Sequence, residues 1–403
     1  MLLMAGTATS FAQASELLES LAGLTIAPKQ VERRTHGIGT ERCVERDAAV
    51  AAYHAQTLVE RKGVPSGVTP PDLAVVQMDG GRLQIFDRAL PPDEQPKTRW
   101  REEKVGWLGS MTSVGHASDP CPVVPSALRD EPDRIRRLVQ EFQAVPRVMD
   151  EIPAADTTGS MADATSSASA ASADPLVVYE PPTVNVGSVV ATTREAASFG
   201  ELLSCAAWQR GFYGAERRAF LGDGSAANWG VWERHFSNFT PIVDFMHALT
   251  YVYRAATADA TLADGWSRYQ MLIASLWAGD VATVIATLTV RHTALGPPEA
   301  SDGVIHPRTI VAETIRYLTN QAERMRYADY RRAGLPITTS HIESTIKRMN
   351  RRVKGTEKFW SKSGAEAIVQ LRADQLSNAQ ALDDFVARRA ACQTGIRTHT
   401  LAA

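Results

Sequence analysis

The chain has 403 residues, 44% hydrophobic and 22% charged, with a formal net charge of -2 at pH 7. No apolar run approaches the roughly 18 residues that a membrane span needs, so the composition excludes a transmembrane protein and predicts a soluble one. The four cysteines lie far apart without a C-x-x-C pair, which argues against a zinc ribbon or a disulfide framework. The opening residues lack the basic and sustained apolar regions of a signal peptide, and we expect a cytoplasmic protein.

The first segment, residues 1–69, reads as helical. An amphipathic helix is predicted from Ala14 to Leu24, a Gly- and Pro-containing break follows, and a basic second helix runs from Lys29 to His36. Two helices joined by a short turn form either a helix-turn-helix or a plain helical hairpin. The sequence leaves both open.

The next segment has the pattern of antiparallel strands. Leu73 to Met78 and Arg82 to Phe86 flank Asp79-Gly80-Gly81, which predicts a β-hairpin, and Glu103 to Met111 is a third strand. A helix from Arg134 to Val148 should follow. The Ser-, Ala- and Thr-rich residues of about 151–176 cannot bury enough apolar surface to offset the entropy of ordering, and predict a flexible insertion.

Helices and strands then alternate. We expect helices at Ala196 to Gly211 and near Trp229 to His235, and strands at Arg218 to Leu221 and Thr240 to Val243. This alternation predicts a partly parallel sheet covered by helices, hence an α/β core. From Asp244 to about Asn320, apolar residues at helical spacing predict an entirely helical stretch.

Three acidic residues lie at the ends of these predicted elements. Asp79 and Asp223 end strand-like runs, and Glu343 lies in the first turn of a helix. Each has a simpler explanation, because Asp-Gly is a turn signal and Glu343 follows Ser340 at capping-box spacing. Together they predict a site for two Mg²⁺ (or Mn²⁺) ions, which prefer carboxylate oxygens and support phosphoryl transfer. Asp79, Asp223 and Glu343 are therefore the candidate catalytic and metal-binding residues.

Basic residues surround the third acid. Between Arg324 and Lys358, ten Lys or Arg residues stand against three acids, although the whole chain is slightly acidic. Basic clusters bind phosphate backbones by releasing counterions, while the alternative is a solvated helix face. The candidate DNA-binding residues are Lys347, Arg348, Arg351, Arg352, Lys354 and Lys358.

Asp244 and His247 close one strand and open the following helix. Asp244 could be an ordinary N-cap with His247 in the first turn. Alternatively, the pair orients a ligand of the site or contacts DNA.

These motifs together resemble bacterial insertion-sequence transposases of the Mutator-like and Kra type. The resemblance covers roughly residues 70–380 and rests on Met78-Asp79-Gly80, on residues 220–229, on residues 243–248, and on residues 334–360. It implies an RNase H-like catalytic domain with an Asp-Asp-Glu triad at Asp79, Asp223 and Glu343. It also assigns the Asp-x-x-His motif of the family to Asp244 and His247.

The resemblance implies an RNase H-like mixed sheet flanked by helices, with an all-helical insertion domain and a small helical N-terminal region. The expected units are the N-terminal region 1–69, the first part of the core 70–250, the helical insertion 251–325, the C-terminal part of the core with its basic face 326–385, and a tail 386–403. The N-terminal region lacks the zinc-binding or clearly basic DNA-reading module that such transposases often carry, and the insertion at about 151–176 is unusual for them.

The resemblance implies an enzyme that cuts and joins DNA at the ends of an insertion sequence. Its partner would be double-stranded DNA, both the terminal repeats and the target, with a dimer or larger assembly on DNA in the bacterial nucleoid. One alternative is a decayed or repurposed copy that only binds DNA. Another is a helical scaffold that binds proteins, in which the acids are merely turns and caps.

Overall fold

The structure is a computed structural model that describes residues 1–86, 91, 98–143, 180–355, 358–378 and 380–389. Its centre is a six-stranded mixed sheet in the order β3-β2-β1-β4-β5, with β6 also paired to β1. The strands are β1 Leu73–Ile85, β2 Trp100–Thr112, β3 Thr183–Thr192, β4 Arg217–Gly222, β5 Thr240–Val243 and β6 Phe359–Trp360. The first three pair antiparallel, whereas β4 and β6 run parallel to β1 and β5 runs parallel to β4. The predicted mixed α/β core is confirmed.

The long strand β1 corrects one prediction. The segment expected to be a hairpin turning at Asp79 is a single strand of 13 residues, and its partner is β2. Gly81 lies opposite Glu103, and a Cβ at Gly81 would come within 2.3 Å of the Glu103 carboxylate. The glycines therefore make room for side chains of β2 instead of forming a turn. The strand β3, which follows the low-complexity tract, was not predicted.

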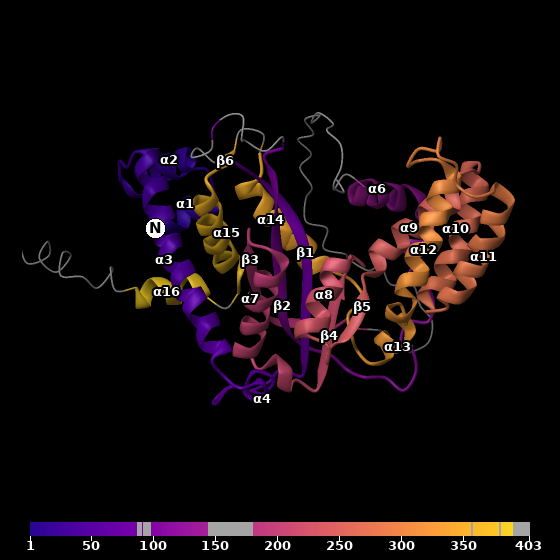
Figure 1. Ribbon diagram of the computed structural model, residues 1–403, viewed down its shortest axis with the longest axis horizontal. Coiled ribbons are helices and arrows are strands. Elements are labelled where there is room, and N and C mark those ends of the chain that lie inside the picture. Colours follow the sequence, from indigo (N-terminus) through magenta and orange to yellow (C-terminus); the bar gives the residue numbers. More distant parts are fainter. Residues whose placement is uncertain (87–90, 92–97, 144–179, 356–357, 379, 390–403) are drawn as a thin grey trace, which may run out of the picture.

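Helices cover both faces of the sheet (Figure 1). Helices α7 Ala196–Gln209 and α8 Ala226–His235 lie on one face, and α14 Ser340–Val353 and α15 Lys362–Leu376 lie on the other. Neighbouring residues of β2 point to opposite faces, as in any strand. A Cβ at Gly106 would meet Leu203 of α7, while the ring of Trp107 stacks on His341 of α14 with 4.4 Å between ring centroids.

Helices α1 Leu2–Ala8 and α3 Pro28–His54 pack against α15 on the side away from the sheet, and α2 Phe11–Ala22 packs against α1 and α3. The short α4 Leu58–Arg61 lies beside α7, where Trp208 donates a hydrogen bond to the carbonyl of Glu60. Helix α3 is longer than predicted, and Gly39 approaches Ala367 of α15 so closely that a Cβ would come within 2.8 Å of its Cβ and carbonyl oxygen. The helix-turn-helix remains a prediction.

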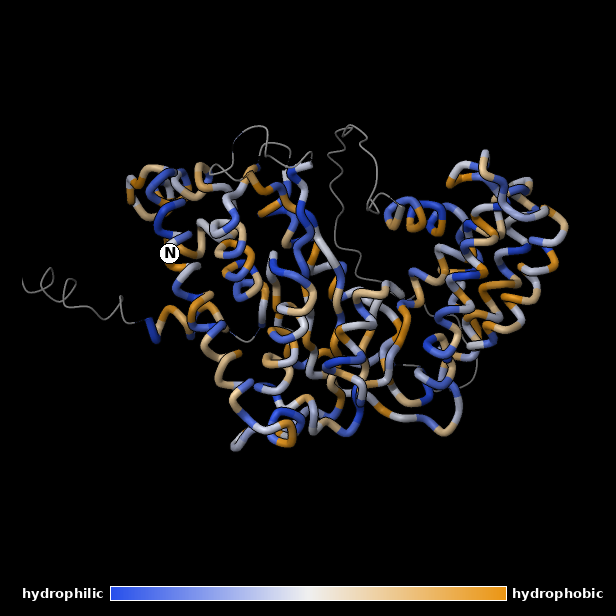
Figure 2. The backbone as a smooth tube through the Cα atoms, in the orientation of Figure 1, coloured by the Kyte–Doolittle hydropathy of each residue, from blue (hydrophilic) through white to orange (hydrophobic). Residues whose placement is uncertain are grey.

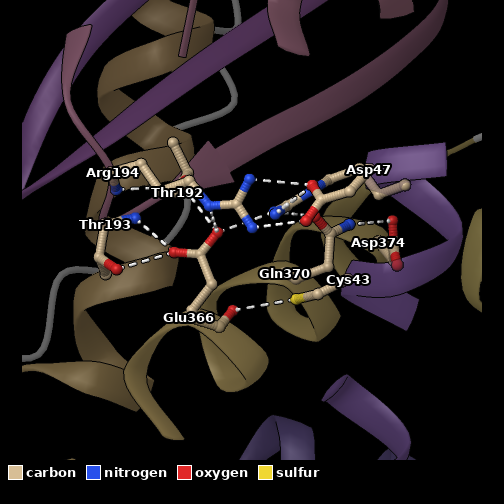
Figure 3. Close-up of polar contacts among 9 residues, drawn as sticks. Cys43, Asp47, Thr192, Thr193, Arg194, Glu366, Gln370 and Asp374 are labelled. Atoms are coloured by element: carbon tan, nitrogen blue, oxygen red, sulfur yellow. Dashed lines mark hydrogen bonds and ion pairs between the residues drawn. The ribbon is translucent and has the colours of Figure 1, made fainter. Parts of the chain in front are cut away.

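A polar network fixes α3 to the core (Figure 3). Glu366 of α15 accepts hydrogen bonds from Thr192 and Thr193 at the end of β3 and from Arg46 of α3. Arg194 reaches back to Asp47, with its shortest contact at 2.6 Å. The N-terminal helices are thus joined to the sheet through α15 and β3.

A bundle of helices lies beyond the β5 edge of the sheet (Figure 1). Its members are α9 Phe245–Thr257, α10 Leu262–Trp277, α11 Val281–Leu295 and α12 Pro307–Gln321. The predicted helical stretch from Asp244 to Asn320 is therefore confirmed as four helices joined by turns and by a loop before α12. Figure 2 shows hydrophobic stretches both in the sheet and along this bundle.

Shorter elements complete the described chain: α5 Ser126–Arg129, α6 Pro132–Gln143, α13 Tyr327–Arg332, α16 Ala381–Arg388, and 3₁₀ helices at Phe212–Gly214 and Ala322–Arg324. The predicted insertion at about 151–176 and most of the tail lie outside the described residues. Within the described part of the chain, none of the helices has the length and apolar character required to cross a membrane.

Candidate active site

Three aspartates lie at one edge formed by neighbouring parallel strands: Asp223 and Asp244 follow the ends of β4 and β5, and Asp79 lies within the longer β1. Gln77 of β1 pairs with Leu221 of β4, so Asp79 and Asp223 each stand two residues beyond a paired position. Gly222 pairs with Val243 of β5, so Asp223 and Asp244 each follow a paired residue. The carboxyl ends of adjacent parallel strands meet at one edge, where open α/β sheets commonly bind ligands.

The glutamate comes to this edge on the first turn of α14. Gln77, fully buried in β1, donates a hydrogen bond of 3.1 Å to the carbonyl of Thr338 and accepts one of 3.0 Å from the backbone N–H of Ile342. Side chains two residues apart on a strand share a face, so Asp79 faces the same side of the sheet as Gln77. Gln77 therefore aligns the start of α14 with the strand that carries Asp79.

The start of α14 differs from the predicted capping box. The N-cap is Thr339, and Ser340 is the first residue of the helix, so the proposed Ser340 and Glu343 capping box is wrong. The Thr339 hydroxyl instead donates a 3.0 Å hydrogen bond to Glu343 Oε1. This bond orients the carboxylate near the helix N-terminus, where the helix dipole favours negative charge.

Asp244 is the N-cap of α9, as one of its two sequence interpretations predicted. It is fully buried, and its Oδ2 accepts hydrogen bonds of 2.8 Å from both the backbone N–H and Nδ1 of His247. Its Oδ1 accepts another, also of 2.8 Å, from the Thr339 N–H. Three donors already engage this carboxylate, so its arrangement favours orienting His247 and the entry to α14 over binding a ligand directly.

Asp223 begins the turn between β4 and α8. Its Oδ1 accepts a 2.8 Å hydrogen bond from the Ser225 N–H and a 2.9 Å bond from the amide of Asn228. The turn that the sequence offered as an alternative role is therefore present. A turn residue at a strand end can still ligate a cation, since each carboxylate oxygen carries two lone pairs.

The electrostatics couple these groups. Burial and, after it, the nearby charges of Asp223 and Glu343 raise the pKa of Asp79 to about 7, against the lowering effects of the Gly80 N–H and His247. Burial and the charge of Asp244 likewise raise the pKa of Glu343. Part of each shift comes from the charge of a neighbouring carboxylate, and a cation bound between these groups would relieve that repulsion.

The pKa of His247 is also raised, which for a histidine favours the charged form. Burial alone would lower its pKa, but the hydrogen bond and charge of Asp244, together with Asp223 and Asp79, raise it to about 9. The ring of Phe142 packs edge-on against it, with 4.7 Å between ring centroids. His247 is therefore a cation at neutral pH in the absence of a metal.

Among the described residues, one group has ligand atoms close enough to share a cation: one atom each of Asp244, His247 and Glu343 lie within 4.8 Å of one another. The predicted set of Asp79, Asp223 and Glu343 does not form such a group in the described chain, although the charges of Asp223 and Glu343 act on Asp79. Its three carboxylates are the hard oxygen ligands that Mg²⁺ prefers, whereas a protonated imidazole must lose its proton before it can ligate a metal.

The candidate DNA-binding residues on and after α14 divide into different environments. Arg348, Arg351 and Lys354 are exposed; Lys347 is exposed too but pairs with Glu141 at 3.2 Å. The ammonium of Lys358 donates to the carbonyls of Arg351 and Lys354, each at 3.3 Å. These five remain candidates.

The structure contradicts the predicted role of Arg352 in binding DNA. It is only 3% exposed, its guanidinium donates to the carbonyl of Gly6 at 2.9 Å, and it stacks on the rings of Phe11 and Trp360. A buried guanidinium held between aromatic rings cannot reach a DNA phosphate. Arg352 instead fastens α1 and α2 to the core.

Several positioning residues escaped the sequence analysis. Gln77 is a polar residue within the apolar run of β1, and that contrast was the signal for it. Thr339 and Asn228 lie within segments already singled out, but nothing in their spacing revealed their partners.

Comparison with known protein families finds none that matches the chain. Comparison with curated proteins likewise finds no match.

Proposed function

We propose that the protein is a Mg²⁺- or Mn²⁺-dependent DDE transposase that cuts DNA at the ends of an insertion sequence and joins them to a target. The observation that carries the proposal is geometric: the register of β1 and β4 sets Asp79 and Asp223 each two residues beyond a paired position, and the Gln77 hydrogen bond to Ile342 holds the start of α14, with Glu343, against β1. Partly buried carboxylates supplied by the middle of β1, the end of β4 and the start of α14 are costly to keep near one another without a cation to bind.

The order of the strands supports an RNase H-like core for this enzyme. Three antiparallel strands are followed by two that are parallel to the first, and the helical bundle is inserted between the second and third acids. This is the organisation that the resemblance to Mutator-like and Kra-type transposases implies. The alternative of a protein-binding scaffold gives no reason for the acids to meet.

Asp79, Asp223 and Glu343 would hold two metal ions. When bound, such ions activate a water or a DNA 3′-hydroxyl and stabilise the leaving oxygen. Asp244 keeps His247 protonated and engages its Nδ1, which leaves Nε2 as the nitrogen for a phosphate oxygen. The charge on His247 also offsets part of the carboxylate charge when DNA enters.

The basic surface of α14 would guide the DNA to these residues. Lys347 and Arg351 lie one and two turns beyond Glu343 on the same face of the helix, because residues four apart are stacked along a helix. Arg348 and Lys354 add exposed charge next to them. The phosphate backbone would then run along α14 toward the carboxylates.

The test is metal-dependent nicking of a labelled duplex that carries the DNA flanking the coding sequence, for the wild type beside Glu343→Gln. Cleavage by the wild type alone, with equal DNA binding by both, is the expected result. Salt-sensitive binding without cleavage by either would favour the decayed DNA-binding copy. Equal cleavage by both would refute the role of Glu343.

A further inference from the structure

The helical bundle reaches the loop that carries the second acid. Helix α12 contributes two side chains to this contact: the Tyr317 hydroxyl donates to the carbonyl of Asp223, and the Gln321 amide donates to the carbonyl of Gly224, both at 2.9 Å. Tyr317 and Gln321 are four residues apart and so lie on one face of α12. Two successive carbonyls of the loop are thereby held from outside the sheet.

The backbone conformation and the surroundings of Gly224 both favour glycine at this contact. Its φ of +98° lies in the region that residues with a side chain rarely adopt. A Cβ at this position would also come within 2.8 Å of the Tyr317 ring. The loop therefore lies too close to Tyr317 of α12 for a side chain at position 224. This close contact fixes the path of the backbone at Asp223, directly after β4.

Tyr317 is itself held by the helix that carries His247. Its ring stacks on Tyr251 of α9, with 3.9 Å between ring centroids and 10° between planes. Tyr251 stands one turn after His247 on α9, and α9 begins directly after Asp244. The bundle therefore contacts the acidic edge twice, through the first turn of α9 and through the face of α12.

We infer that Tyr317 and Gln321 are positioning residues for Asp223, so that the helical bundle holds a carboxylate of the metal site in its binding orientation. This inference rests on the proposed function for its metal, but the contact with the loop can be measured without one. The helical bundle would then orient Asp223 of the proposed site, in addition to being inserted between the second and third acids. Tyr317 does not touch the reacting atoms.

The experiment compares full-length wild type with Tyr317→Phe, which removes only the hydroxyl, and with Gln321→Glu, which replaces the donor by an acceptor. Tyr269→Phe is the matched control, since the Tyr269 hydroxyl also donates to a backbone carbonyl, that of Leu128 at 2.7 Å, away from the acids. Hydrogen exchange of the metal-free protein is followed in peptides spanning residues 222–228. Mn²⁺ affinity is then measured by titration.

We expect the Ser225 amide, which donates to Asp223, to exchange about tenfold faster in both α12 variants, and Mn²⁺ to bind about tenfold more weakly, the effect of losing one hydrogen bond. Tyr269→Phe should match the wild type in both measurements. Unchanged exchange would overturn the inference. Faster exchange with unchanged Mn²⁺ affinity would also overturn it, because the contact would then be purely structural.

Failure of the proposed function has a different signature. A wild-type protein that binds no Mn²⁺ contradicts the metal site, not the contact between α12 and the loop. Exchange alone then decides the inference: faster exchange in both α12 variants supports it, and unchanged exchange refutes it.

Discussion

The backbone N–H of Ile342 donates a 3.0 Å hydrogen bond to the side chain of Gln77, and this bond joins the middle of β1 to the first turn of α14. Asp79 stands two residues from one partner, and Glu343 stands directly after the other. Their separation in sequence is large, yet their relative position is set by one buried amide. The amide also satisfies the Thr338 carbonyl, so both of its ends are used.

Replacing this amide should loosen the site. Gln77→Met keeps the length of the side chain but leaves the Ile342 N–H and the Thr338 carbonyl without partners in the core. We expect the free energy of unfolding, measured in urea, to fall by about 2–4 kcal/mol, because each unsatisfied buried group costs about 1–3 kcal/mol. Cleavage should fall further than stability explains, since Glu343 loses its alignment.

Gln84→Met is the matched control for that substitution. Gln84 is buried further along the same strand and donates to the carbonyl of Gly355 at 2.7 Å. Its loss should lower stability to a similar extent while cleavage by the folded protein stays near the wild-type level. Equal loss of cleavage in the two variants would mean that Gln77 has no special role.

The acidic edge should be a source of instability until a cation binds. Asp79→Asn keeps the shape and the hydrogen bond from Gly80 but removes a carboxyl whose pKa is raised to about 7. A raised pKa in the folded state weakens the fold as pH rises from about 4 to 7, so at pH 8 the metal-free variant should be more stable by about 2–4 kcal/mol.

Added Mg²⁺ should reverse this order. The wild type would gain about 2.7 kcal/mol at a hundred times the dissociation constant, whereas Asp79→Asn would gain little. The exposed Asp72 at the start of β1 provides the control variant Asp72→Asn, which should behave as the wild type. Thermal denaturation with and without Mg²⁺ measures all three proteins.

Two adjacent arginines of α14 should respond differently to truncation. Arg351→Ala removes an exposed charge, and it should lower the slope of DNA affinity against salt concentration by about 1 with stability unchanged. Arg352→Ala should instead cost about 2–3 kcal/mol of stability, because the Gly6 carbonyl loses its donor and two aromatic rings lose their packing. Salt-dependent binding measurements and urea denaturation test the pair, and a shared salt effect would contradict the burial of Arg352.

A buried carboxyl away from the site should make stability depend on pH. Glu103 is fully buried, its carboxylate oxygens find no hydrogen-bond partner among the described residues, and burial raises its pKa to about 8, with Lys354 opposing. The unfolded chain ionises this group near pH 4.5, so its contribution to stability should fall between pH 4.5 and 8, by up to about 5 kcal/mol. Glu103→Gln should remove most of that fall, whereas Glu102→Gln at the exposed neighbouring position should leave it intact.

The sequence predicted the helices and parallel strands well where apolar periodicity was strong, as in β4, β5 and the bundle. It failed at Asp79-Gly80-Gly81, because an Asp-Gly pair is a turn signal and only the packing of Glu103 over Gly81 shows why the strand continues. Arg352 was wrongly assigned to the DNA-binding surface for a similar reason. Its partners, Gly6, Phe11 and Trp360, come from elements distant in sequence.

The candidate site was predictable as a list of residues but not as an arrangement. Asp223 follows a strand and Glu343 lies in the first turn of a helix, as the sequence predicted, whereas Asp79 lies within β1 and not at its end. The contacts that orient them do not follow from spacing, since Gln77, Thr339 and Tyr317 act through backbone groups whose position depends on the complete fold.

The central claim is that Asp79, Asp223 and Glu343 form one divalent-cation site, and Mn²⁺ titration of the full-length protein tests it most directly. The wild type should bind Mn²⁺, and Asp79→Asn, Asp223→Asn and Glu343→Gln should each weaken binding at least about tenfold, since each removes a charged ligand. Asp72→Asn should bind as the wild type does. Mn²⁺ binding that is absent from the wild type, or equal in all of these proteins, would contradict the claim.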